Sequence, residues 1–159
     1  MNVMKKRVLT LGYHNKRLQV LPVHWDFPKM TFQQLCYNWK TMNRTEKVPP
    51  LSMLNKGHVS HLKKGWSKLR MMMTVMRKVE SIGRERSVWI DAREWTVTEV
   101  DKMIDGVLPV LGELLHLNNS NRMKELSWKT IYNKMCKADM FGGKGMGRGR
   151  PIGTGRGQR

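Results

Sequence analysis

Residues 60–80, SHLKKGWSKLRMMMTVMRKVE, decide the expected fold of this chain. At about 100° per residue, apolar side chains recur every three or four positions and line one face of a helix: Leu62, Trp66, Leu69, Met73 and Met76. The remaining surface carries six positive charges and two hydroxyls, from Lys63, Lys64, Ser67, Lys68, Arg70, Thr74, Arg77 and Lys78. The stretch therefore predicts an amphipathic helix, whose charged side is either an ordinary solvated surface or a face for a phosphate backbone.

Two further helices are predicted before the basic one. Thr31 and Gln34 match a capping box, in which each side chain bonds the backbone of the other, and predict a helix from about residue 31 to residue 42. A polar turn and Pro49-Pro50 separate it from a short helix that Gly57 ends. The order of helix, turn, short helix, turn and long basic helix is typical of a small helix-turn-helix-like DNA-binding unit.

A neutral helical packing or interaction region is predicted over residues 83–140, after a break at 83–86. Thr98 has a capping pattern and starts a leucine-rich helix over 98–117, which Pro109 kinks or splits at the preceding leucine. This helix is either the centre of the core or a self-association surface, and the small size of the chain favours the core. A last helix, from Met123 to Met135, carries lysines on its other side.

The 159 residues carry a net charge of +18, and its distribution is uneven. Residues 1–80 hold 16 Lys or Arg and 3 Asp or Glu, residues 81–140 hold 9 of each, and residues 141–159 hold 5 and none. Such a chain is expected to bind a polyanion, with nucleic acid ahead of an anionic membrane. No apolar run approaches the roughly 18 residues of a membrane span. Four segments follow: a basic lead-in (1–29), a helical nucleic-acid-binding unit (30–82), the neutral region (83–140) and a tail (141–159).

Neither a metal site nor catalysis is indicated. Two cysteines and five scattered histidines have no zinc spacing, so no metal or cofactor is expected. Cys36 and Cys136 read as reduced packing residues, with a single disulfide as the alternative. His14 and Arg17 have the His-x-x-Arg spacing of tyrosine recombinases and Tyr37 lies downstream, but only 13 residues precede the pair and the other catalytic residues of such enzymes have no room there. The chain is predicted to be non-enzymatic.

The tail, FGGKGMGRGRPIGTGRGQR, cannot bury a core and is predicted to be disordered when free. Its Arg148-Gly149-Arg150-Pro151 resembles the core of an AT-hook, in which Gly lies against the floor of the minor groove and the two Arg side chains run along it. Arg156 supplies a further charge. The alternatives are a Gly/Arg tail that binds RNA or single strands without sequence preference, and a tail with no defined ligand.

Spaced Trp, Pro and Leu positions carry a family resemblance. They are Trp25-Asp26-Phe27-Pro28-Lys29-Met30-Thr31-Phe32, Leu35, Trp39, Pro49-Pro50-Leu51 and Leu54, followed by the basic helix with Met76, Val79 and Glu80. Over residues 20–82 the chain resembles the DNA-binding domain of the fungal glycolysis-regulator transcription activators, which is also appended to Crypton-type recombinases. Asn38 departs from that family, which usually has an acidic residue before the tryptophan. The resemblance implies an all-helical, sequence-specific DNA binder that uses the polar face of the 60–80 helix, and a relic of a mobile element.

The expected function is duplex DNA binding in transcription regulation, through the basic helix and the AT-hook-like tail. Lys5-Lys6-Arg7 is compatible with nuclear import, and the acid-free start is equally compatible with a mitochondrial presequence. The alternative from another class is a structural RNA-binding protein, such as an organellar ribosomal or viral ribonucleoprotein component. A third reading makes 98–117 a self-association surface.

Overall fold

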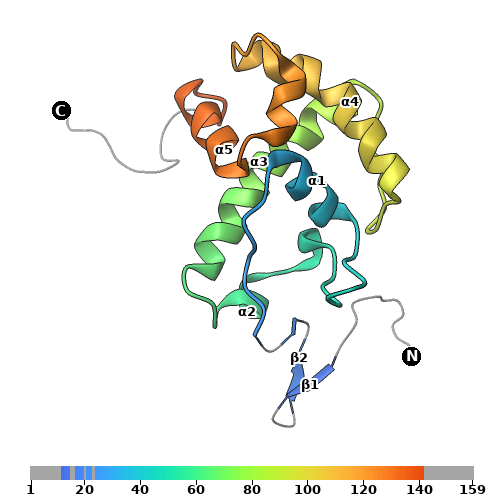
Figure 1. Cartoon of the computed structure of the whole chain (residues 1–159), viewed down its shortest axis with the longest axis vertical. Coiled ribbons are helices and arrows are strands. Elements are labelled where there is room, and N and C mark those ends of the chain that lie inside the picture. The colour runs from blue at the N-terminus through green and yellow to red at the C-terminus, as the bar shows by residue number, and fades with distance from the viewer. Residues whose placement is uncertain (1–11, 15–16, 20, 23, 142–159) are drawn as a thin grey trace, which may run out of the picture.

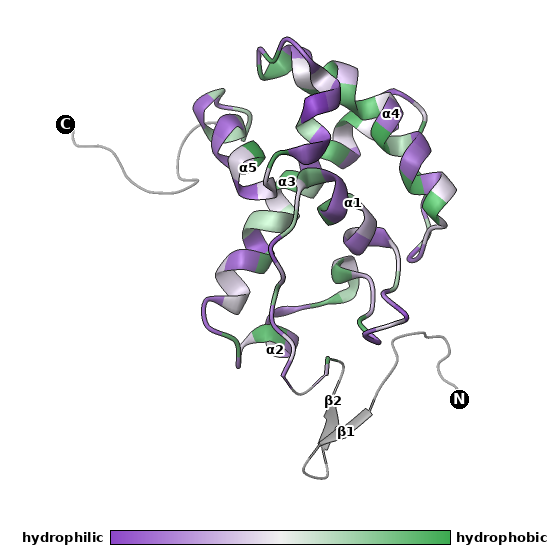
Figure 2. Cartoon of the chain, viewed as in Figure 1, coloured by the Kyte–Doolittle hydropathy of each residue, from purple (hydrophilic) through white to green (hydrophobic). Residues whose placement is uncertain are grey.

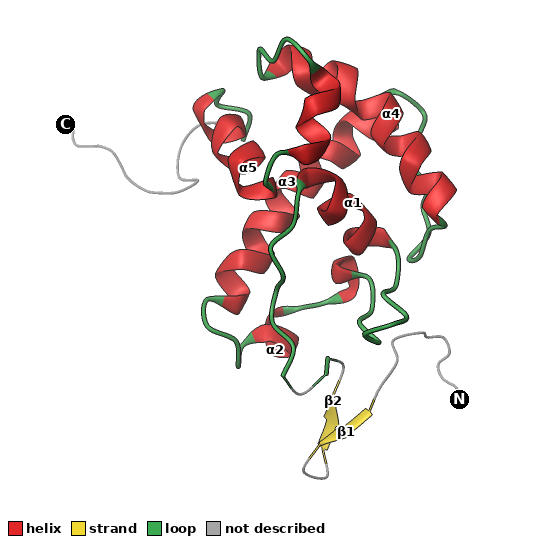
Figure 3. Cartoon of the chain, viewed as in Figure 1, coloured by secondary structure: helices red, strands yellow, loops and turns green. Residues whose placement is uncertain are grey.

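The computed structural model describes residues 12–14, 17–19, 21–22 and 24–141 (Figure 1). Its helices are α1 (Phe32–Lys40), α2 (Lys56–Val59), α3 (Gly65–Glu85), α4 (Val97–Leu114) and α5 (Trp128–Lys137), with two 3-10 helices, η1 (Leu51–Met53) and η2 (Ser120–Glu125). Two strands, β1 (Gly12–His14) and β2 (Arg17–Gln19), pair antiparallel (Figure 3). The helical class is confirmed for the body of the fold. The hairpin escapes sequence prediction because three-residue strands are too short to show alternation.

The start of α1 agrees with the predicted capping box. The N–H of Gln34 donates to Thr31 Oγ1 at 3.1 Å, and the N–H of Thr31 donates to Gln34 Oε1 at 3.0 Å. These bonds satisfy backbone donors that the helix itself leaves free. One face of α1 is buried, through Phe32, Leu35, Cys36 and Trp39.

The segment before α1 pairs with the start of α5, almost a hundred residues away in the chain. Thr31 and Ser127 form an antiparallel bridge. The residues on either side of them exchange backbone hydrogen bonds of 2.7 and 3.2 Å. This bridge joins the chain at the start of α1 to the start of α5.

α2 and α3, which flank the turn at 60–64, differ from their predicted bounds. Gly57 does not end a helix, because it lies inside α2. α3 starts at Gly65, five residues after the predicted Ser60, because the chain first turns sharply. Lys64 has a left-handed φ of 56°, and a Cβ on Gly65 would lie 2.2 Å from the carbonyl oxygen of Val59. Only glycine allows α3 to start this close to α2.

The predicted apolar stripe of α3 is partly wrong. Leu69 and Met76 are buried, whereas Trp66 and Met73 are only partly covered. The side that faces the core comprises Gly65, Leu69, Met72, Val75, Met76, Val79, Ile82 and Gly83. Residues 71–76, MMMTVM, place apolar groups around most of the helix, so periodicity alone could not locate the buried face. Packing against both α4 and α5 then buries a wide arc.

The capping residue of the leucine-rich helix α4 lies two residues before the predicted Thr98. Thr96 caps it, with reciprocal bonds of 3.2 and 2.8 Å to Glu99. The helix continues through Pro109, which is exposed, so the predicted split at Leu108 is wrong. Its apolar face packs in the core through Val100, Met103, Ile104, Val107, Leu108 and Leu111. Self-association through 98–117 stays a prediction, although most of its apolar surface is already covered.

The last helix is also shorter than predicted. Residues near Met123 form η2, and α5 begins only at Trp128, where the hydroxyl of Ser127 accepts from the N–H of Lys129 at 3.2 Å. The break in the chain at the predicted 83–86 agrees with the end of α3.

One hydrophobic core connects the predicted segments 30–82 and 83–140. α3 packs on both α4 and α5, and α1 packs on α4, α5 and η2. Figure 2 shows hydrophobic and hydrophilic residues interspersed along each helix, as expected for helices with one buried face. Methionine contributes heavily to the fully buried positions, with Met72, Met76, Met103, Met123 and Met135. Flexible thioether side chains fill irregular gaps between helices that cross at varied angles.

Candidate nucleic-acid interface

The start of α3 is an exposed basic corner. Lys63 and Lys64 are exposed in the turn between α2 and α3. No side chain caps the first turn of α3. The positive end of the helix dipole therefore adds to the charge of the two lysines. An anion is favoured at such a position.

An exposed row of polar side chains continues from this corner along α3. We call it the outer stripe: Ser67, Arg70, Thr74, Arg77 and Lys78, at three- and four-residue spacing. Ser67, Arg70 and Arg77 are exposed, and the other two are half-buried. The Arg70 guanidinium lies 5.9 Å from the centre of the Trp66 ring, a cation–π contact that restrains its position. The Thr74 hydroxyl donates to the carbonyl of Arg70 at 2.9 Å, so its proton is already engaged.

The cations of the outer stripe have no acidic partner in the described part of the chain. Ion pairs there join Arg44 to Glu94, Arg84 to Glu80 and Asp91, and Lys124 to Asp105. None of them involves a basic residue of the corner or the outer stripe. Uncompensated charge of this kind is available to an external anion.

Lys68 faces a different direction from the outer stripe. It is half-buried and lines a cleft of about 560 Å³ together with Lys29 and Lys129. We call this the basic cleft. The sequence grouped Lys68 with Arg70 and Arg77, but on the folded helix it lies on the α5 side. The predicted polar face is therefore divided into two surfaces.

Comparisons of the chain with protein-family models, with curated proteins and with solved structures return no match. The family resemblance of residues 20–82 stays a prediction.

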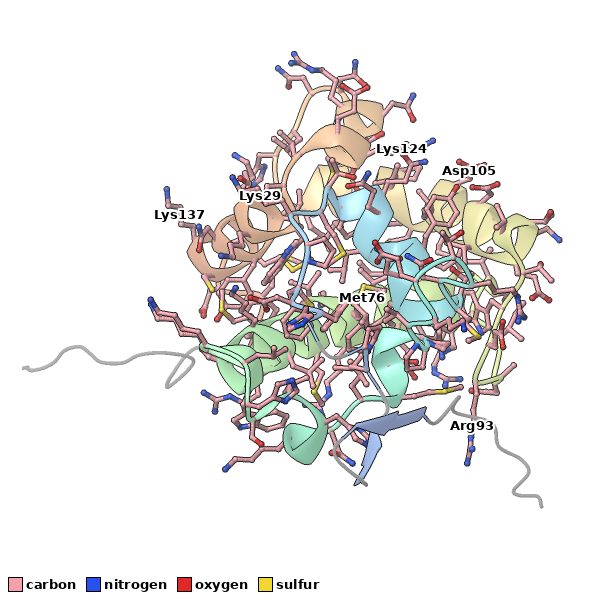
Figure 4. The ribbon with its side chains drawn as sticks, turned by 60° about the horizontal axis from the view of Figure 1, so that its bottom comes forward. Lys29, Met76, Arg93, Asp105, Lys124 and Lys137 are labelled. Atoms are coloured by element: carbon pink, nitrogen blue, oxygen red, sulfur yellow. The ribbon has the colours of Figure 1, made fainter. Side chains whose placement is uncertain are left out.

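Charge is segregated between helices. α4 carries four acidic residues and one lysine, whereas α3 has five basic and two acidic residues and α5 has three lysines and no acid. In Figure 4, Lys29 and Lys137 lie on one side of the molecule and Asp105 lies on the other. A polyanion is attracted to the α3 and α5 side and repelled by α4.

Two cations near α3 are engaged in holding the loop before α4. The Nζ of Lys40 lies 5.3 Å from the ring centres of both Trp89 and Trp95 and donates to the carbonyl of Ala92 at 3.1 Å. Burial lowers the pKa of Lys40. Arg84 pairs with Glu80 at 2.8 Å and with Asp91 at 2.6 Å. These residues stabilise the fold and are not offered to a ligand.

Other predicted features are placed as follows. The Tyr37 hydroxyl donates to Asp101, and this hydrogen bond raises the pKa of the phenol. Both cysteines are free, so the alternative of a disulfide is wrong: Cys36 is buried and Cys136 is exposed. Within the described ranges no group of three or more His, Cys, Asp or Glu could hold a metal ion, and no helix is long and apolar enough to cross a membrane.

The predicted tail residues Arg148, Gly149, Arg150 and Arg156 lie outside the described residues. The point at which the tail begins is described. Phe141 and Met140 line a shallow groove of about 290 Å³ with Thr74, Arg77, Lys78 and Ser81 of α3. The tail therefore starts beside the outer stripe.

Sequence reasoning did not identify Lys29 and Lys129 as site residues. Neither belongs to a basic cluster in the sequence, and only the bridge between Thr31 and Ser127 brings them to Lys68. The lysines of the last predicted helix were a signal of a second basic surface, but nothing local connects them with α3.

Proposed function

We propose that this chain is a non-enzymatic duplex-DNA-binding protein in which α2, the following turn and α3 act as a helix-turn-helix-like unit. The observation that carries the proposal is the outer stripe, whose three cations lie on the solvent side of α3 and have no acidic partner among the described residues. Phosphates would provide most of the affinity. Residues near the start of a recognition helix contact base edges, which assigns that role to Ser67 and Arg70, and arginine suits guanine.

Within this proposal the chain is a nuclear transcription regulator or a DNA binder derived from a mobile element. Support comes from the residues that carry the family resemblance, because Trp39, Pro50 and Leu51 are buried. Positions that define a shared fold belong in its core. The polar positions of the resemblance, in contrast, are largely exposed on α3.

The tail would add a second contact to the same duplex. Arg148 is the seventh residue after Phe141, and an extended chain spans at most about 3.3–3.6 Å per residue, or roughly 24 Å. That reach extends from the outer stripe to a neighbouring minor groove. Linking two weak modules in this way raises affinity through effective concentration. Truncation after Phe141 should therefore weaken duplex binding and remove any preference for A·T tracts.

Fluorescence anisotropy with a labelled duplex tests the role of α3. Replacing Arg70 and Arg77 together with alanine should lower affinity about 10- to 100-fold and reduce the slope of log affinity against log salt by about 2. The matched control replaces Arg93, which is exposed in the loop before α4, and Lys102, which is exposed on α4. It should leave the affinity and the salt slope unchanged. Equal affinities for the two double variants would exclude α3 as the DNA-binding helix.

A structural RNA-binding protein is the second candidate. It is favoured by the width of the basic surface, which extends past α3 to Lys29 and Lys129 around the basic cleft. Competition between the duplex and a structured RNA at one salt concentration separates the two functions. Displacement of the duplex by a much lower concentration of RNA would assign the chain to RNA.

A further inference from the structure

The basic cleft is a surface separate from the outer stripe. It is lined by residues of three segments that are distant in sequence: Phe27, Pro28, Lys29, Met30, Thr31 and Gln34, then Lys68 and Met72 of α3, then Glu125, Ser127, Trp128 and Lys129. Thr31 and Ser127, which form the bridge, are both among them. Its volume of about 560 Å³ lies within the roughly 300–1,000 Å³ of small-molecule sites.

The charge of the basic cleft is unbalanced. Lys29, Lys68 and Lys129 contribute three ammonium groups, against the single carboxylate of Glu125. No carboxylate of the described chain lies within 4 Å of these three ammonium groups. Lys129 is restrained by a cation–π contact, its Nζ lying 5.9 Å from the centre of the Trp128 ring. Three lysines around one cleft, with Thr31 and Ser127 also in its lining, suit a phosphate.

The rest of the lining is apolar. Phe27 and Pro28 supply the accessible part of this lining, whereas Met30 and Met72 are buried. An aromatic ring such as that of Phe27 stacks well on a flat heterocycle. A ligand that matches both the lysines and the apolar lining of the basic cleft has a planar body and a charged phosphate at one end. We propose that the basic cleft binds a nucleoside 5′-phosphate, either free or as the phosphorylated 5′ end of a strand. The inference stands independently of duplex binding by α3.

Isothermal titration of the full chain with adenosine monophosphate tests the proposal, with adenosine and inorganic phosphate as partial ligands at the same ionic strength. The monophosphate should bind at least tenfold more tightly than either part. Lys29→Ala and Lys129→Ala should each weaken it about tenfold, because each removes one charge-assisted hydrogen bond. Lys137→Ala is the matched control, since Lys137 is exposed on α5 and does not line the cleft.

Two short single strands, one with a 5′-phosphate and one with a 5′-hydroxyl, distinguish the sources. Binding of the phosphorylated strand that is tighter than that of both the hydroxyl strand and the monophosphate assigns the site to strand ends. Equal binding of the two strands, with the monophosphate still bound in the cleft, assigns it to free nucleotides. The proposal is overturned if the monophosphate does not bind at millimolar concentration. It is also overturned if inorganic phosphate binds equally well, or if Lys137→Ala weakens binding as much as Lys129→Ala. Circular dichroism melts confirm that each variant is folded.

Discussion

The geometry of the turn between α2 and α3 depends on Gly65. A Cβ there would lie 2.2 Å from the carbonyl oxygen of Val59 and 2.9 Å from Cβ of Leu62, so Gly65→Ala must displace backbone. We expect urea unfolding to show a loss of about 1–3 kcal/mol. Gly57→Ala is the control, because Gly57 is exposed on α2 and its Cβ would meet only the Asn55 side chain, at 3.3 Å. It should change stability by less than about 1 kcal/mol, and equal losses would contradict the packing argument.

The two cysteines should differ in reactivity. Cys36 is fully buried, and burial raises the pKa of its thiol, whereas Cys136 is exposed. The thiolate is the reactive form, so a chromogenic disulfide reagent should label one thiol per native chain and a second only after denaturation. Cys136→Ser should remove the fast phase and leave the slow one. Rapid labelling of two thiols in the native chain would show that α1 is not packed as described.

Single residues also show what sequence can predict. The capping box of Thr31 and Gln34 lies within four consecutive residues, so its hydrogen bonds can be predicted without knowledge of the fold. The orientation of Lys68 cannot be predicted from sequence, because it depends on the packing of α5 against the adjacent side of α3. The nearby run 71–76 offers apolar groups in almost every direction, so no helical wheel could decide which side is buried.

At the scale of elements, Arg84 connects α3 to the loop before α4. Its hydrogen bonds and charge hold the pKa of Asp91 below its usual value. A carboxylate with a depressed folded pKa stabilises the fold above its unfolded pKa, about 3.9, and this contribution is lost as pH falls through the folded pKa. Arg84→Gln should therefore lower stability at pH 7, and the difference from the parent chain should close below about pH 4.

Urea unfolding at pH 7, 4 and 2.5 measures the role of Arg84. The effect should be small, because the pair is exposed, and 1 M salt should reduce it. Arg93→Gln is the matched control, since Arg93 is exposed in the same loop and belongs to no described ion pair. A destabilisation by Arg84→Gln that is the same at all three pH values would point to lost packing instead of charge.

Elements were predictable where their ends are marked locally. α1 has a capping box of the pattern that sequence can show, and its ends agree with the predicted 31–42 to within two residues. The capping box of α4 is two residues before the predicted one, and that helix ends three residues before the predicted 117. α2 and α5 depart further: the first contains the glycine expected to end it, and the second begins five residues after the predicted start at Met123. The capping box of α2 joins Asn55 and His58, which do not have the Ser/Thr-x-x-Glu/Gln pattern that marks a helix start in sequence.

At the scale of the whole molecule, the fold requires its C-terminal helix. The core includes Trp128, Ile131 and Met135 of α5 together with residues of α1 and α3. A chain truncated after Leu126 should therefore lose its cooperative thermal transition, and a fragment of residues 30–82 should not fold alone. Truncation after Phe141 is the control and should melt as the full chain does. A native-like melt of the 30–82 fragment would show that the basic unit is independent.

The bridge between Thr31 and Ser127 also constrains how the chain is made. Its partners are 96 residues apart, and a ribosome adds about 5–20 residues per second. The lead-in and α1 must therefore wait roughly 5–20 s for the residues that pin them. During that interval the apolar faces of α1 and α3 are uncovered while the basic corner is already synthesised. The nascent chain is expected to depend on a chaperone, and a pause in translation before residue 128 would prolong its exposure to aggregation.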